Sequence, residues 1–92
     1  MTTIDSSARP AIARGLRLQW EPAQEAHVLL YPEGMIKLNS SAGEIMKRCD
    51  GKRTLTDITA DLEQAFSATG LAKDVEAFVA MAVDKRWLDI QP

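Results

Sequence analysis

The side chains that most often carry out chemistry occur in this sequence one at a time. His27 is the only histidine and Cys49 the only cysteine among the 92 residues. One imidazole and one thiol do not make a metal site of the histidine and cysteine type, and the serines lack a plausible general base. The five glycines are scattered over turn positions, so the sequence has no glycine-rich phosphate loop. We therefore expect no catalytic residues, no metal and no cofactor, and hence not an enzyme.

Length and charge narrow the possible functions further. The 92 residues, 46% of them apolar, predict a single folded domain. Such a domain buries roughly 60–65% of the surface of its unfolded chain, enough for one modest core but not for a deep active-site cleft. The net charge is −2 and the pI is near 5.3, whereas a duplex DNA binder usually has a basic excess. We therefore expect no nucleic-acid partner.

Cysteine usage and the N-terminal residues indicate the cellular compartment. A lone cysteine forms no internal disulfide and suits a reducing cytoplasm. We interpret Cys49 as a small buried apolar residue and His27 as a structural or surface histidine. The first seven residues hold no signal-peptide stretch, and no apolar run approaches the roughly 20 residues of a membrane span. We expect a cytoplasmic protein with no membrane partner.

The N-terminal residues differ in character from the rest of the chain. They are small and polar and end at Arg9–Pro10. This composition predicts a flexible tail over residues 1–10 and a folded domain over residues 11–92.

Three short segments follow that have the patterns of β-strands. Apolar and polar residues alternate over 16–20, which predicts a strand with Leu16, Leu18 and Trp20 facing inward. The apolar run over 27–31 predicts a strand buried on both faces. A proline and glycine turn at 32–34 leads into a third strand over 35–38. The first half of the chain is therefore expected to form a three-stranded antiparallel meander.

The hydrophobic period then changes to that of helices. Ser41 is the expected N-cap of a first helix, with Glu44 completing a capping box, and Asp50–Gly51 is expected to end it. The core stripe of this helix is predicted to consist of Ala42, Ile45, Met46 and Cys49.

Two further helices complete the predicted fold. Thr54 with Asp57 predicts the start of a second helix over 55–66, and residues 74–86 are expected to form a third. The apolar residues 87–90 have some strand character. Strands followed by helices indicate an α+β domain, and a tight turn between the first two helices makes it winged helix-turn-helix-like.

The third predicted helix is more apolar than a small domain requires. Only Glu76 is charged between residues 75 and 83, and the large apolar side chains cover roughly 200° of the helix, about twice the usual stripe. The surplus indicates an interaction surface, unless the sheet and the other helices enclose this helix from both sides. The large apolar side chains of this arc are Val75, Phe78, Val79, Met81 and Val83.

The third strand offers a second place for a partner to bind. The edge of a small sheet has unpaired N–H and C=O groups, and an extended peptide can add there as a further strand. Most edges are simply protected, and Lys37 could serve that purpose here.

Four segments match a single pattern in their order and spacing: residues 14–20, 28–34, 38–42 and 49–54. Together they resemble one known family, the PqqD family of pyrroloquinoline quinone biosynthesis. The similarity runs from about Pro10 to Leu88. Its two most specific motifs are the Leu-Tyr-Pro-Glu-Gly segment and the Asp-Gly-Lys-Arg-Thr turn, which are informative together but not alone.

The resemblance implies both a fold and a function. PqqD-like proteins have three strands followed by three helices and act as recognition elements for the precursors of ribosomally made, modified peptides. They bind the precursor peptide PqqA and present it to the radical S-adenosylmethionine enzyme PqqE. The resemblance further implies that the peptide adds beside the third strand and packs against the third helix.

These arguments predict a peptide-binding site between the third strand and the third helix. Phe78 and Met81 share one flank of the apolar arc with Lys85 close in angle, so we expect this flank to contact the peptide rather than Val79 and Val83. The full predicted set is Met35, Ile36, Lys37, Leu38, Val75, Phe78, Val79, Met81 and Lys85.

Two other functions remain open at this point. A DNA-binding winged helix needs a basic recognition helix, but the second helix carries Asp57, Asp61 and Glu63 and no lysine or arginine. A structural dimerisation domain would use the wide apolar face of the third helix, and a homodimer is compatible with the sequence.

Overall fold

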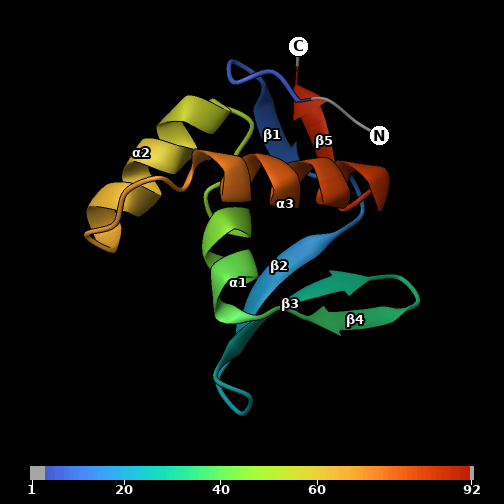
Figure 1. The fold of residues 1–92 in the computed structure, drawn as a ribbon. Helices are drawn as coiled ribbons and strands as arrows, with labels where there is room; N and C mark the ends of the chain where they lie inside the picture. The colour runs from blue at the N-terminus through green and yellow to red at the C-terminus, as the bar shows by residue number, and fades with distance from the viewer. Residues whose placement is uncertain (1–3, 92) are drawn as a thin grey trace.

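The computed structural model describes residues 4–91, and the start of the predicted tail, residues 1–3, lies outside this range. Two small antiparallel sheets and three helices make up the fold (Figure 1). In chain order the elements are β1 (Arg9–Ile12), β2 (Arg17–Glu21), β3 (Ala26–Tyr31), β4 (Gly34–Lys37), α1 (Ser40–Met46), α2 (Leu55–Ala65), α3 (Ala72–Asp84) and β5 (Leu88–Gln91).

The predicted meander is confirmed as the sheet β2-β3-β4. Both pairings are antiparallel, and the register places Leu29 between Leu18 and Ile36. Val28 and Leu29 are adjacent, point to opposite faces, and are both fully buried, as predicted for a strand covered on two sides. The α+β class is therefore as the sequence predicts, and the three strands of this sheet are followed by three helices as expected.

A second sheet joins the two ends of the described chain and was not predicted. β1 pairs with β5, so that Arg9 lies opposite Gln91 and Pro10 opposite Ile90. The carbonyl oxygens of Ser6 and Ala8 accept hydrogen bonds from the amides of Thr56 and Leu55, at 3.2 and 3.0 Å. Residues 6–10, which the polar composition assigns to a flexible tail, are thus tied to β5 and to the start of α2.

The first helix starts at a different cap from the predicted one. The side chain of Asn39, not Ser41, accepts the hydrogen bond from the amide of Ala42, at 2.8 Å. Ser41 lies inside the helix and donates its hydroxyl to Asn39 Oδ1 at 3.0 Å. Asn39 prevails because amide and hydroxyl side chains cap almost equally well, so that the backbone preceding the helix decides which one is used.

The second helix has the predicted capping box. The Thr54 hydroxyl accepts from the amide of Asp57, and the Asp57 carboxylate accepts from the amide of Thr54. The third helix begins two residues before the predicted start, at Ala72, and ends at Asp84. Within residues 4–91, none of the helices has the length and apolar run needed to span a bilayer.

The core lies where the helices meet the inner face of the larger sheet. The predicted first-helix stripe of Ala42, Ile45, Met46 and Cys49 is buried in it. In the view of Figure 1, α3 crosses between the two-stranded sheet above and the three-stranded sheet below. The other buried members include Leu29, Leu55, Ile58, Leu62, Val75, Val79, Ala82 and Leu88.

The ring of Trp20 lies outside the core, contrary to the prediction. It follows Leu18 by two residues and so shares its face of β2, yet Trp20 is 51% exposed. The ring meets His27 edge-on, with the ring centroids 5.1 Å apart. α1 is only seven residues long and approaches this face at His27, beside Gly43, so the tryptophan beyond it stays half in solvent.

Candidate functional site

The open edge of β4 is the first part of the candidate site. Among the described strands β4 pairs only with β3. The amide of Leu38 donates to the carbonyl of His27 at 3.0 Å. Because bonded residues alternate along an antiparallel pair, Ile36 also faces β3, whereas Met35 and Lys37 direct their N–H and C=O groups to the open side.

The side chains of β4 divide between the two faces of the sheet. Leu38 is buried and Ile36 packs against the core. Met35 and Lys37 are exposed on the other face. A peptide that paired with this edge would therefore find backbone groups at Met35 and Lys37, and apolar side chains of the domain on the core side.

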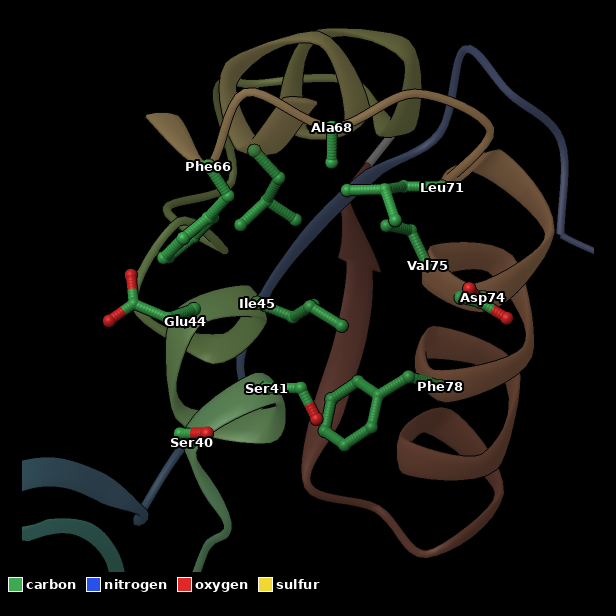
Figure 2. A pocket seen from close by; sticks show the side chains of 11 residues that line it. Ser40, Ser41, Glu44, Ile45, Phe66, Ala68, Leu71, Asp74, Val75 and Phe78 are labelled. Carbon is green, nitrogen blue, oxygen red and sulfur yellow. The ribbon is translucent and has the colours of Figure 1, made fainter. Parts of the chain in front are cut away.

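A groove of about 580 Å³ begins just past the end of β4. It runs between α1 on one side and α3 on the other, and is closed at one end by the last turn of α2 and the α2–α3 connection (Figure 2). The lining residues are Ser40, Ser41, Glu44, Ile45, Leu62, Phe66, Ala68, Leu71, Asp74, Val75 and Phe78.

Apolar side chains form most of this groove. Ile45, Leu62 and Val75 are buried members of the core whose edges reach the groove. The ring of Phe78 projects from α3 toward Ser41 of α1 (Figure 2). Phe66 is 55% exposed at the end of α2 and is the most exposed large apolar side chain described.

Phe66 and the α1 residues of the groove are functional candidates that the sequence analysis missed. The helical period places Phe66 in the buried stripe of α2 with Leu55, Ile58 and Leu62. The structure ends the helix at Ala65, with Phe66 as its C-cap, so the ring turns out of the core. A possible signal was the position of Phe66 directly before Ser67-Ala68-Thr69-Gly70, a loop-like run.

A buried arginine holds two walls of the groove together. Arg48 donates to the carbonyl oxygen and carboxylate of Glu44 on α1, at 2.9 and 2.8 Å, and its Nε donates to the Asp61 carboxylate on α2. The hydrogen bond from Arg48 is the main cause that lowers the pKa of Glu44, and likewise that of Asp61. Both carboxylates are therefore ionised at neutral pH. Their hydrogen bonds to Arg48 keep α1 and α2 in fixed relative positions.

The structure brings only part of the predicted site residues into this groove. Val75 and Phe78 line it. Val79 is fully buried in the core, so its side chain is not available to a partner. Met81 is half-buried further along α3, and the Lys85 ammonium lies 5.9 Å from the centre of the Trp87 ring, outside the groove lining.

Cys49 is buried, as predicted. Its thiol donates to the carbonyl of Ile45 at 3.2 Å, and burial raises its pKa from 9.0 to about 12. Within residues 4–91, no three side chains of histidine, cysteine, aspartate or glutamate are placed to hold a metal ion together.

Comparison with known proteins identifies what this arrangement is similar to. The family model described as coenzyme PQQ synthesis protein D (PqqD) matches residues 26–88. The "PqqA binding protein" of Stutzerimonas stutzeri is 47% identical over 92 residues, covering 99% of this chain and 100% of the relative. The protein of the same name from Pseudomonas aeruginosa UCBPP-PA14 is 49% identical over 83 residues, covering 89% and 90%.

A solved structure matches the fold over nearly its full length. It is the solution NMR structure of the PqqD truncation of Methylobacterium extorquens PqqCD, described as a functional and stand-alone recognition element for ribosomally synthesized and post-translationally modified peptides. The TM-score is 0.73 at 31% identity, and the match covers 96% of each chain.

Proposed function

Because this chain belongs to the PqqD family, we propose that it is a recognition element that binds a PqqA-type precursor peptide as an added strand along β4. The observation that carries this proposal is the open edge of β4 at Met35 and Lys37, which leads directly to an apolar groove. The name of the relatives supplies the identity of the peptide.

The two parts of the site contribute differently to binding. Backbone hydrogen bonds to the edge contribute about 0.5–1.5 kcal/mol each and depend little on the peptide sequence, so they fix its register. Side-chain contacts with Phe78 and Met81 on α3 supply selectivity, as in other strand-addition complexes. Val79 supports this surface from within the core rather than contacting the peptide.

We further propose that the bound peptide is presented to a radical S-adenosylmethionine enzyme of the PqqE type. The chain itself has no catalytic role in this proposal, because a peptide held by its backbone along β4 leaves outward-facing side chains accessible to an enzyme. DNA binding is the weaker candidate, since α2 carries three acidic residues and no basic one.

The edge pairing is tested by removing one backbone donor. Lys37→Pro deletes the open N–H at that position, while Lys37→Ala removes the charge and keeps the N–H. Titration of each ¹⁵N-labelled variant with the Stutzerimonas stutzeri PqqA peptide should show roughly two- to tenfold weaker binding for Lys37→Pro and little change for Lys37→Ala. If the proline variant remains folded and binds like the parent, the peptide lies elsewhere.

The α3 contact is tested separately. Met81→Asp places a charge at a half-buried apolar position and should weaken binding of the same peptide by roughly tenfold or more. Met81→Leu keeps the apolar surface and is the matched control. Equal affinities for the two variants, with both folded by circular dichroism, would remove Met81 from the site.

A further inference from the structure

The groove lies past the last residue of β4 and continues away from the strand. The last open backbone groups of β4 are at Lys37, and the lining begins at Ser40, three residues later. Three residues span at most about 11 Å. A peptide paired with β4 therefore reaches the groove with at most about three more residues.

The far end of the groove has an exposed aromatic ring on a backbone that is fixed by hydrogen bonds. The amide of Ala68 donates to the carbonyl of Glu63 at 2.9 Å and that of Ser67 to Gln64 at 3.4 Å, the pattern of a Schellman motif around the C-cap Phe66. The helix end is thus fixed, and the ring stays half in solvent beside Leu62 and Ile45. A preformed, exposed apolar surface of this kind indicates a binding role.

We propose that Phe66, Leu62, Ile45 and Phe78 form a second subsite, which takes one bulky apolar side chain of the precursor peptide from the segment just outside the added strand. This inference rests on the proposed function, because it assumes that the peptide pairs with β4. Phe66 is then a specificity-determining residue of the groove, in addition to the α3 residues.

The size and charge of the groove define the peptide segment that fits. About 580 Å³ falls within the range of about 300–1,000 Å³ typical of ligand pockets, so it has room for a large side chain and its neighbours. The two ionisable residues in the lining, Glu44 and Asp74, are both acidic, and Lys47 and Arg48 already pair with Glu44. An aromatic or aliphatic residue flanked by neutral or basic residues therefore suits the groove, and an acidic flank does not.

The test combines a protein variant with an alanine scan of the peptide. Phe66→Ala should weaken binding of the Stutzerimonas stutzeri PqqA peptide by roughly tenfold, while Phe66→Leu should retain most of the affinity. Ile90→Ala, which truncates an exposed apolar residue on β5, should have no effect. The alanine scan should identify one apolar peptide residue outside the segment whose amides become protected against exchange. Its substitution by alanine should weaken binding to the parent protein but not to Phe66→Ala, because the effects of two side chains in contact are coupled.

The outcomes separate this inference from the proposed function. A parent protein that does not bind the peptide contradicts both. A parent that binds, together with a folded Phe66→Ala variant of equal affinity, overturns only the second subsite. If sedimentation shows a dimer of the peptide-free parent that Phe66→Ala dissociates, a second copy occupies the groove, and the inference fails.

Discussion

At the scale of single residues, Gly43 sets how closely α1 approaches β3. A Cβ at this position would lie 2.9 Å from Nδ1 and 3.2 Å from Cβ of His27. The second distance matters more, because the His27 Cβ is attached directly to the strand backbone and cannot turn away. α1 therefore rests so close to the sheet that an added methyl group at this position would press on His27.

Gly43→Ala is expected to destabilise the protein even though it improves helix propensity. Alanine gains about 1 kcal/mol over glycine within a helix, but overpacking costs about 1–3 kcal/mol. We expect a net loss of about 1 kcal/mol and a lower melting temperature by circular dichroism. In a His27→Gly background, which removes the Cβ as well as the ring, the same substitution should instead stabilise; a higher melting temperature of the single variant would show that His27 moves aside.

The buried thiol of Cys49 makes stability depend on pH at the alkaline end. Burial is the main cause that raises its pKa from 9.0 to about 12, with a smaller contribution from Asp50. The unfolded chain therefore loses this proton first, and the stability that the neutral thiol contributes falls as pH rises from about 9 toward about 12.

Cys49 should accordingly be unreactive in the folded protein. At pH 8 we expect negligible labelling by iodoacetamide in native buffer and rapid labelling in urea, because the thiolate is the reactive form. Urea titrations at pH 8 and pH 10 should show lower stability at the higher pH. Rapid labelling under native conditions would contradict the burial of this side chain.

At the scale of elements, two helices end in the same strained way. Ser67 after α2 and Arg86 after α3 have φ values of 51° and 64°, in the left-handed region that glycine normally occupies. At the end of α3 the amide of Trp87 donates to the carbonyl of Ala82 at 2.8 Å, as the amide of Ala68 does to Glu63 after α2. Both turns help to orient residues around the groove and the core.

Ser67→Gly and Arg86→Gly are each expected to stabilise the fold. Replacing a non-glycine residue in this region by glycine relieves backbone strain of about 1–3 kcal/mol in the folded state. The greater conformational freedom that glycine gives the unfolded chain offsets about 0.5–1 kcal/mol of this gain. We expect a net gain of about 0.5–1 kcal/mol in urea unfolding. The alanine variants at the same positions keep the strain and serve as controls; equal stability of glycine and alanine variants would contradict this explanation.

At the scale of the whole molecule, the two ends of the described chain meet in one sheet. β1 supplies the partner strand of β5, and the carbonyl of Pro10 accepts from the amide of Gly51 at 2.8 Å. Pro10 is buried and Ile12 packs against the core. The N-terminal segment is thus part of the domain and lies apart from the proposed peptide site on β4.

Deletion of residues 1–12 is therefore expected to destabilise the whole domain. β5 loses its partner strand, and the amides of Gly51, Leu55 and Thr56 lose their acceptors, so we expect a loss of about 3 kcal/mol or more. Urea unfolding followed by circular dichroism measures the change, and a chain that starts at Ile4 is the control because it keeps every described contact. A deletion that left the unfolding midpoint unchanged would mean that β1 contributes nothing.

The sequence by itself determined the features that depend on neighbouring residues. The strand patterns over 16–20, 27–31 and 35–38, the buried stripe of α1, the Thr54 capping box and the buried thiol of Cys49 were all predictable from it. Alternation, helical period and cap chemistry act within a few residues of the chain, so they can be interpreted without knowing the fold.

Tertiary structure alone decided which side chains the elements finally cover. Trp20 lies on the predicted face but beyond the end of a short helix, and Arg9 and Pro10 pair with a strand that is about 80 residues away in the chain. Phe66 fits the apolar stripe of α2, yet the helix ends at that point and leaves the ring in the groove. Burial depends on which element lies opposite, and that is a property of long-range packing rather than of local pattern.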